Sequence, residues 1–149
     1  MILILALPFA LLLQGCGGKP SAAEGTYELD KAAFVEQGLK SLIDSGRIPA
    51  AAREIGRRQL ERVSSILELK GDGTFVNFME MSGRKHEFTG EWTQKGNRIE
   101  LRQTHSDGKE KEDAMSGTLD GDHLFLTHEE EGLSFPYPMR RRRAHASPK

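Results

Sequence analysis

Residues 85–104 read KHEFTGEWTQKGNRIELRQT and contain the clearest structural pattern in the chain. In the first part of this stretch, charged and polar residues alternate with His86, Phe88, Gly90 and Trp92. Strict alternation predicts a β-strand with one buried face, because successive side chains point to opposite sides of a sheet. Lys95-Gly96-Asn97 follows, and Gly and Asn reach the positive φ that hairpin turns require. The stretch therefore predicts an antiparallel hairpin.

The same period of two continues outward from this hairpin in both directions. Turn sequences rich in Gly, Asp and Asn separate the runs at intervals of about ten residues, a spacing typical of an antiparallel meander. The last run carries Pro136 and Pro138 on its outward face, which suits a closing or edge strand because proline has no N–H to donate. The predicted strands of the meander are Ile66–Lys70, Thr74–Met81, Lys85–Thr93, Arg98–Thr104, Lys111–Thr118, His123–His128 and Leu133–Met139.

The residues before the meander show one strand and then a helical period. Gly25–Asp30 alternates like a strand, and Asp30 is a suitable N-cap for a helix that begins at Lys31 and ends near Gly46. Pro49 is suited to the first turn of a second helix, which continues to Arg62. The apolar positions fall at helical spacing. They are Phe34, Val35, Leu39, Leu42 and Ile43 in the first helix, and Ile55, Leu60 and Val63 in the second.

One strand, a helical excursion and a seven-strand meander resemble the lipocalin-like (calycin) barrels of bacterial envelope lipoproteins. The matching pieces are Gly25-Thr26-Tyr27, residues 67–75 (LELKGDGTF), Gly90-Glu91-Trp92, residues 117–122 (GTLDGD) and Phe135. The resemblance implies a mainly β fold, in which about eight antiparallel strands form an up-and-down meander that closes into a barrel. Two helices would be inserted between the first and second strands. Closure is also favoured physically, because it removes both unpaired edges.

An eight-stranded barrel is either filled by side chains or holds one small ligand. The alternation places an apolar set inside, which consists of Tyr27, Leu29, Leu67, Leu69, Phe75, Met79, Met81, Phe88, Trp92, Ile99, Leu101, Met115, Leu119, Leu124, Leu126, Phe135, Tyr137 and Met139. Asn77, His86, Gln103 and His128 share these faces, where a ligand, trapped water or solvent at a strand end would satisfy them. The candidate ligand-binding residues are Trp92, Phe88, His86, Asn77, Gln103 and Tyr137.

The N-terminal residues predict an export signal and a lipid anchor. Residues 1–14 (MILILALPFALLLQ) are apolar, too short to span a bilayer as a helix, and suited to the core of a secretory signal. Leu13-Gln14-Gly15-Cys16 resembles a bacterial lipobox, which implies lipidation of Cys16, the only cysteine. The alternative is a buried N-terminal element with an ordinary thiol. The predicted organisation is a signal at 1–15, a lipidated tether at 16–24, a barrel at 25–139 and a basic tail at 140–149.

Composition and motifs limit the function. With 21 basic and 22 acidic residues the net charge is −1, so no overall field favours nucleic acid. No nucleophile elbow, phosphate-binding loop or zinc motif occurs, and we expect neither an enzyme nor a cofactor or metal. The expected partner is the membrane, through Cys16. The expected location is the bacterial envelope, at the outer membrane because Gly17 follows the cysteine.

Two functions remain open at this stage. In the first, the barrel binds a small apolar or amphipathic ligand without catalysis. In the second, a solid-core barrel acts through its surface as a structural or protein-interaction module of the envelope. The internal volume separates them, because ligand cavities begin at about 300 Å³. Ligand identity and oligomeric state stay open.

Overall fold

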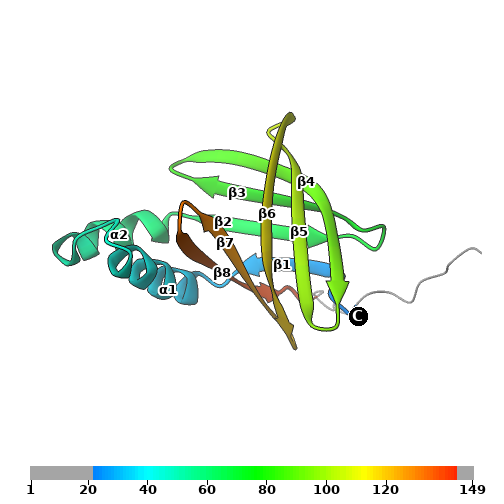
Figure 1. The fold of residues 1–149 in the computed structure, drawn as a ribbon, viewed down its shortest axis with the longest axis horizontal. Coiled ribbons are helices and arrows are strands. Elements are labelled where there is room, and N and C mark those ends of the chain that lie inside the picture. The colour runs from blue at the N-terminus through cyan, green and yellow to red at the C-terminus, as the bar shows by residue number, and fades with distance from the viewer. Residues whose placement is uncertain (1–21, 144–149) are drawn as a thin grey trace, which may run out of the picture.

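The computed structural model describes residues 22–143 and shows a closed antiparallel β-barrel of eight strands in sequence order (Figure 1). The predicted fold class is confirmed, including the helices between the first two strands. The elements are β1 (Gly25–Leu29), α1 (Lys31–Asp44), a 3-10 turn η1 (Ala50–Ala52), α2 (Arg53–Glu61), β2 (Ser64–Leu69), β3 (Thr74–Met81), β4 (Arg84–Lys95), β5 (Arg98–Ser106), β6 (Lys109–Asp120), β7 (His123–Glu130) and β8 (Leu133–Arg141). The signal, Cys16 and the end of the tail lie outside the described residues.

The barrel closes where β1 pairs with β8. The pairing is short, from Tyr27 opposite Arg141 to Leu29 opposite Met139. Asp30 extends it, because its backbone N–H donates to the carbonyl oxygen of Pro138 at 2.9 Å. Its carboxylate accepts from the backbone N–H of Ala33 at 3.2 Å, as the predicted N-cap of α1, and from Arg140 Nη2 at 2.7 Å. One aspartate thus ties the start of α1 to the closing strand.

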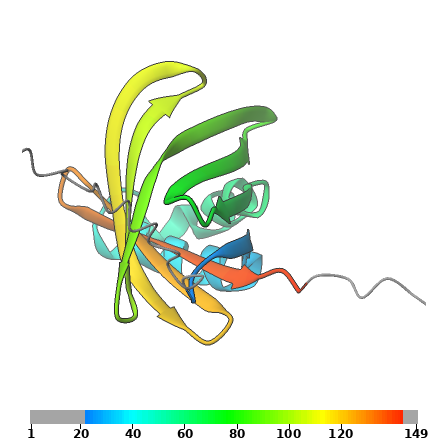
Figure 2. The same ribbon diagram turned by 90° about the vertical axis from the view of Figure 1, so that its right-hand side faces the viewer.

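The two ends of the barrel differ. The turns between β2 and β3, β4 and β5, and β6 and β7 lie at one end, which we call the closed end; the helices precede β2 and so lie at the other, which we call the helix end. Figure 2 looks at the molecule from the closed end, with the helices behind the strands. Large buried side chains fill the closed end. They include Tyr27, Leu69, Phe75, Trp92, Ile99 and Leu124.

At the helix end, α1 packs its apolar stripe against the inner face of β8. Phe34 is buried between Phe135 and Tyr137, with ring centroids 5.6 and 5.5 Å away. Gly38 allows this approach, because a Cβ there would lie 2.8 Å from Cζ of Phe135. The helices therefore cover the barrel on the side of β1, β2 and β8.

The expected inner face of the second helix is partly wrong. Ile55 was expected to be buried with Leu60 and Val63, but it is 64% exposed. Pro49 precedes a 3-10 turn, so the α-helix begins only at Arg53, and its contact with α1 runs through Gly56 and Leu60. A Cβ on Gly56 would lie 3.0 Å from Cδ1 of Leu39, so the glycine permits the close approach of the helices.

The arginines at the end of β8 belong to the barrel. The basic tail was expected to begin at Arg140, but β8 continues to Arg141, because both residues have partners on neighbouring elements. Arg141 Nη1 donates to the carbonyl oxygen of Glu24 at 2.6 Å, and Nη2 donates to the Tyr27 hydroxyl at 2.7 Å. Its guanidinium also lies over the Tyr27 ring, 4.9 Å from the centroid. Arg141 thereby fixes the start of the described chain at the closed end.

Replacing the single tryptophan tests this division of the barrel. Trp92 is 6% exposed, and its Nε1 donates to the carbonyl oxygen of Lys70 at 2.9 Å. Trp92→Ala should lower the free energy of unfolding by about 3–5 kcal/mol in denaturant titrations, the usual cost of truncating a buried aromatic. Phe78→Ala is the control, because Phe78 is 51% exposed on the outer face and should change stability by less than about 1 kcal/mol. Similar losses in both variants would contradict the assigned inner face.

Candidate functional site

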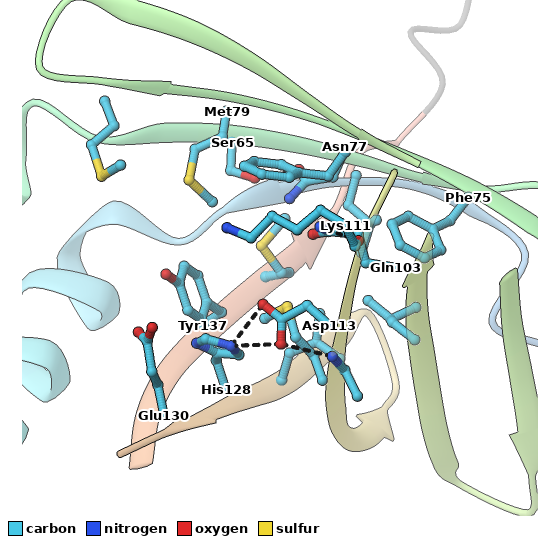
Figure 3. A pocket seen from close by; sticks show the side chains of 18 residues that line it. Ser65, Phe75, Asn77, Met79, Gln103, Lys111, Asp113, His128, Glu130 and Tyr137 are labelled. Carbon is cyan, nitrogen blue, oxygen red and sulfur yellow. Dashed lines mark hydrogen bonds and ion pairs between the residues drawn. The ribbon is translucent and has the colours of Figure 1, made fainter. Parts of the chain in front are cut away.

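The barrel interior contains a cavity of about 350 Å³ at the helix end (Figure 3). Its position follows from its lining, which includes Ser65 at the start of β2, Met81 at the end of β3 and Glu130 at the end of β7. Met81, Lys111 and Glu130 are exposed, and we call the rim that they form the mouth. The cavity is thus open to solvent on the side that the helices do not cover.

The walls of the cavity are largely apolar and rich in methionine. All four methionines in the described part of the chain, Met79, Met81, Met115 and Met139, line it. Methionine is unbranched and polarisable, so a wall built from it adapts to the shape of an apolar occupant. The other apolar and aromatic lining residues are Leu67, Phe75, Phe88, Leu101, Ala114, Leu126 and Tyr137.

Several polar lining groups are satisfied within the barrel. Ser65 Oγ donates to Asn77 Oδ1 at 2.6 Å, across the β2–β3 pair. Gln103 Nε2 donates to the carbonyl oxygen of Lys111 at 3.1 Å. A shift of register places Thr104 outside the regular β4–β5 pairing, next to Gln103. Bulges of this kind re-aim neighbouring side chains, and this one lies beside the cavity.

Asp113 and His128 are hydrogen-bonded on the lower wall in Figure 3. His128 Nε2 lies 3.0 Å from Oδ1 of Asp113, and the same oxygen accepts from the backbone N–H of Ala114 at 2.8 Å. Two partners therefore already hold the Asp113 carboxylate. This aspartate, whose side chain is 37% exposed, is therefore satisfied without a ligand.

Three polar groups that line the cavity have no partner among residues 22–143. The Lys111 ammonium and the Glu130 carboxylate make no ion pair there, and the Tyr137 hydroxyl makes no hydrogen bond there. Burial raises the pKa of Tyr137, and the charges of Glu130 and Asp113 raise it further. Tyr137 consequently keeps its proton and presents a hydroxyl donor to the cavity.

The structure brings four of the six predicted ligand-binding residues together. Asn77, Phe88, Gln103 and Tyr137 all line the cavity. Trp92 does not line the cavity. It lies four residues after Phe88 on β4, toward the closed end, where its indole packs in the barrel core. The expected association of Trp92 with the cavity therefore fails, although its burial is as expected.

His86 also lies outside the cavity lining. Its Nδ1 is 2.9 Å from Oδ2 of Asp107, in the turn between β5 and β6, and its ring stacks near Phe88. The hydrogen bond from His86, followed by one from the backbone N–H of Glu87, lowers the pKa of Asp107. His86 thus joins β4 to the β5–β6 turn.

The sequence reasoning missed the charged lining residues Lys111, Asp113 and Glu130. A signal was present, because Lys111 and Asp113 have the same parity as Met115, which was placed inside, and Glu130 continues the parity of Leu126 and His128 just beyond the predicted strand. Their charge made an inner position unexpected, and the irregular pairing of β5 with β6 near residue 111 could not be read from alternation.

An open apolar cavity with a few polar groups at its mouth is the usual form of a small-molecule site. Residues 22–143 contain no group of three or more side chains placed to hold a metal ion, and no helix among them is long and apolar enough to cross a membrane.

Comparisons with known proteins give no closer relationship. No protein-family model matches the chain, and no curated protein matches it significantly. The eight-stranded antiparallel barrel itself is consistent with the lipocalin-like architecture that the sequence resembled.

The tyrosines provide a test of this site and of the closed end. Burial raises the pKa of both tyrosines in the chain above the ordinary value of 10.0. A raised folded-state pKa stabilises the protein fully below the unfolded-state value, and this stabilisation is lost as pH rises through the folded value. Ultraviolet titration of tyrosinate should therefore show a midpoint above pH 10 in the folded protein, and the stability should fall as the pH rises through that midpoint. A tyrosinate midpoint at or below pH 10 with intact circular dichroism would contradict the burial of these rings.

Proposed function

We propose that this protein is a non-catalytic binding module that holds a small apolar or amphipathic ligand in the cavity at the helix end of its barrel. The observation that carries the proposal is the cavity of about 350 Å³ with methionine-rich walls and an exposed mouth. A solid-core structural barrel, the alternative open from the sequence, needs no such space. The volume lies within the range of known ligand pockets.

We further propose that the protein is a bacterial lipoprotein of the lipocalin-like type, anchored through Cys16 to the outer membrane. The apolar residues 1–14 and the Gly15-Cys16 junction support this assignment. Arg141 holds residues 22–24 at the closed end, so an anchor at Cys16 leaves the mouth of the barrel unobstructed.

Blocking the cavity tests the binding function. In full chain labelled at the methionine methyl groups, octanol should shift the NMR signals of the cavity methionines saturably, since all four in the described chain line the cavity. Met115→Trp should narrow the cavity and weaken octanol binding, as read from the remaining three methionines, because the larger ring takes part of the volume that the ligand occupies.

Thr118→Trp is the matched control, since Thr118 lies on the same strand but is exposed. It should leave the titration unchanged. The absence of a saturable shift with any apolar probe would overturn the binding proposal in favour of a structural module.

The anchor is tested separately. Cys16→Ser removes the thiol that would carry the lipid, so the variant should lose metabolic palmitate labelling and leave the membrane fraction. Wild-type labelling or wild-type partitioning of the variant into detergent would show that Cys16 is not the anchor.

A further inference from the structure

The cavity mouth contains a lysine whose charge nothing in the barrel uses. Lys111 projects from β6 and extends across the cavity between the Ser65–Asn77 wall and the Tyr137–His128 wall (Figure 3). Its ammonium makes no ion pair within residues 22–143. Among the lining residues, the only other basic side chain is His128, which Asp113 already engages.

Apart from Lys111, the cavity lining also contains hydrogen-bond donors that have no partner among the described residues. Asn77 Oδ1 accepts from Ser65, which leaves the Asn77 amide N–H groups without a partner among the described residues. The Tyr137 hydroxyl is also unused and stays protonated through its burial. A lysine, an amide and a hydroxyl together favour a ligand group that accepts hydrogen bonds and carries negative charge.

The acidic residues of the cavity limit how much negative charge a ligand's head group can carry. Asp113 and Glu130 also line the cavity, and Asp113 is compensated by His128 whereas Glu130 is exposed and unpaired at the mouth. A doubly charged head group such as a phosphate monoester would meet repulsion from both carboxylates. Lys111 and Glu130 carry opposite charges at the mouth, so a single carboxylate leaves a net charge of −1 on these groups, whereas a doubly charged head group leaves −2.

The cavity volume limits the length of the apolar part. At about 30 Å³ for each water-sized group, 350 Å³ holds roughly a dozen non-hydrogen atoms. This is the size of a medium-length alkyl or aryl carboxylate.

We propose that the ligand is a medium-length amphiphile with a single carboxylate, whose head group Lys111 binds at the mouth while its apolar part contacts the methionine-rich wall. This inference rests on the proposed binding function and specifies the chemical class of its ligand. Lys111 donates charge-assisted hydrogen bonds to the carboxylate, with the Asn77 amide and the Tyr137 hydroxyl as neutral donors.

The test compares probes that share one tail and differ in the head group. Octanoate, octanol, octyl phosphate and octyltrimethylammonium are titrated into full chain in lipid nanodiscs, and the methionine methyl signals report occupancy of the cavity. Octanoate should bind more tightly than the other three.

Lys111→Met should weaken octanoate binding about three- to tenfold, the effect of losing one partly exposed charged hydrogen bond, and should leave octanol binding unchanged. Glu130→Gln should strengthen octanoate about twofold, because it removes a like charge.

Lys95→Met is the control, because Lys95 is exposed at the closed end of β4 and its replacement changes the net charge equally. It should not alter octanoate binding. Octanol binding as tightly as octanoate, or unchanged octanoate affinity in Lys111→Met, overturns the head-group assignment and leaves the binding function intact. Preferential binding of octyltrimethylammonium or octyl phosphate also overturns it. Failure of all four probes to bind overturns the proposed function itself.

Discussion

Every other feature of this barrel depends on the seam between β1 and β8. The seam is short, because β1 has only five residues and three of them pair with β8. Side chains strengthen it at both ends. Asp30 connects β8 to the start of α1, and Arg141 connects it to Tyr27 and to the backbone of Glu24. A short strand that leads directly into a helix thus closes the barrel through a few well-placed hydrogen bonds, of which those from Arg141 to Glu24 and Tyr27 are partly buried.

The seam also explains why the barrel is filled at one end and hollow at the other. At the closed end, Tyr27 and Trp92 supply large rings to an interior that has no covering helix. At the helix end, α1 follows β1 and therefore packs beside β8, where Phe34 meets Phe135 and Tyr137. The helices do not extend over the β3–β4 and β5–β6 turns, and the space beneath those turns becomes the cavity. Its charged groups Lys111 and Glu130 lie where solvent can reach them.

The sequence predicted the parts of this structure that depend on local periodicity. Alternation identified the strands, and the glycine-rich turns separated them, because both signals act within a few residues. Most of the inner face follows from the same parity, including all four methionines of the cavity wall. The second helix was less predictable. A 3-10 turn precedes Arg53, and in the α-helix that follows Gly56 rather than Ile55 is buried against α1. Which inner residues surround a cavity depends on packing between distant strands, so parity could not separate Trp92 from Phe88.

Because Arg141 hydrogen-bonds to the backbone of Ala22 and Glu24, the chain before β1 leaves the barrel at its closed end, and this affects how a ligand would reach the cavity. Six peptide units separate Cys16 from Ala22, a reach of about 20 Å at full extension, whereas a nine-residue strand such as β8 is about 30 Å long. In a protein anchored at Cys16 as proposed, the attachment and the mouth lie at opposite ends of the barrel, so the mouth reaches the lipid headgroups only when the barrel tilts onto its side or further. An upright barrel would open to the aqueous phase or to a facing surface, and exchange of a bound ligand with the bilayer that carries the protein would require this tilt.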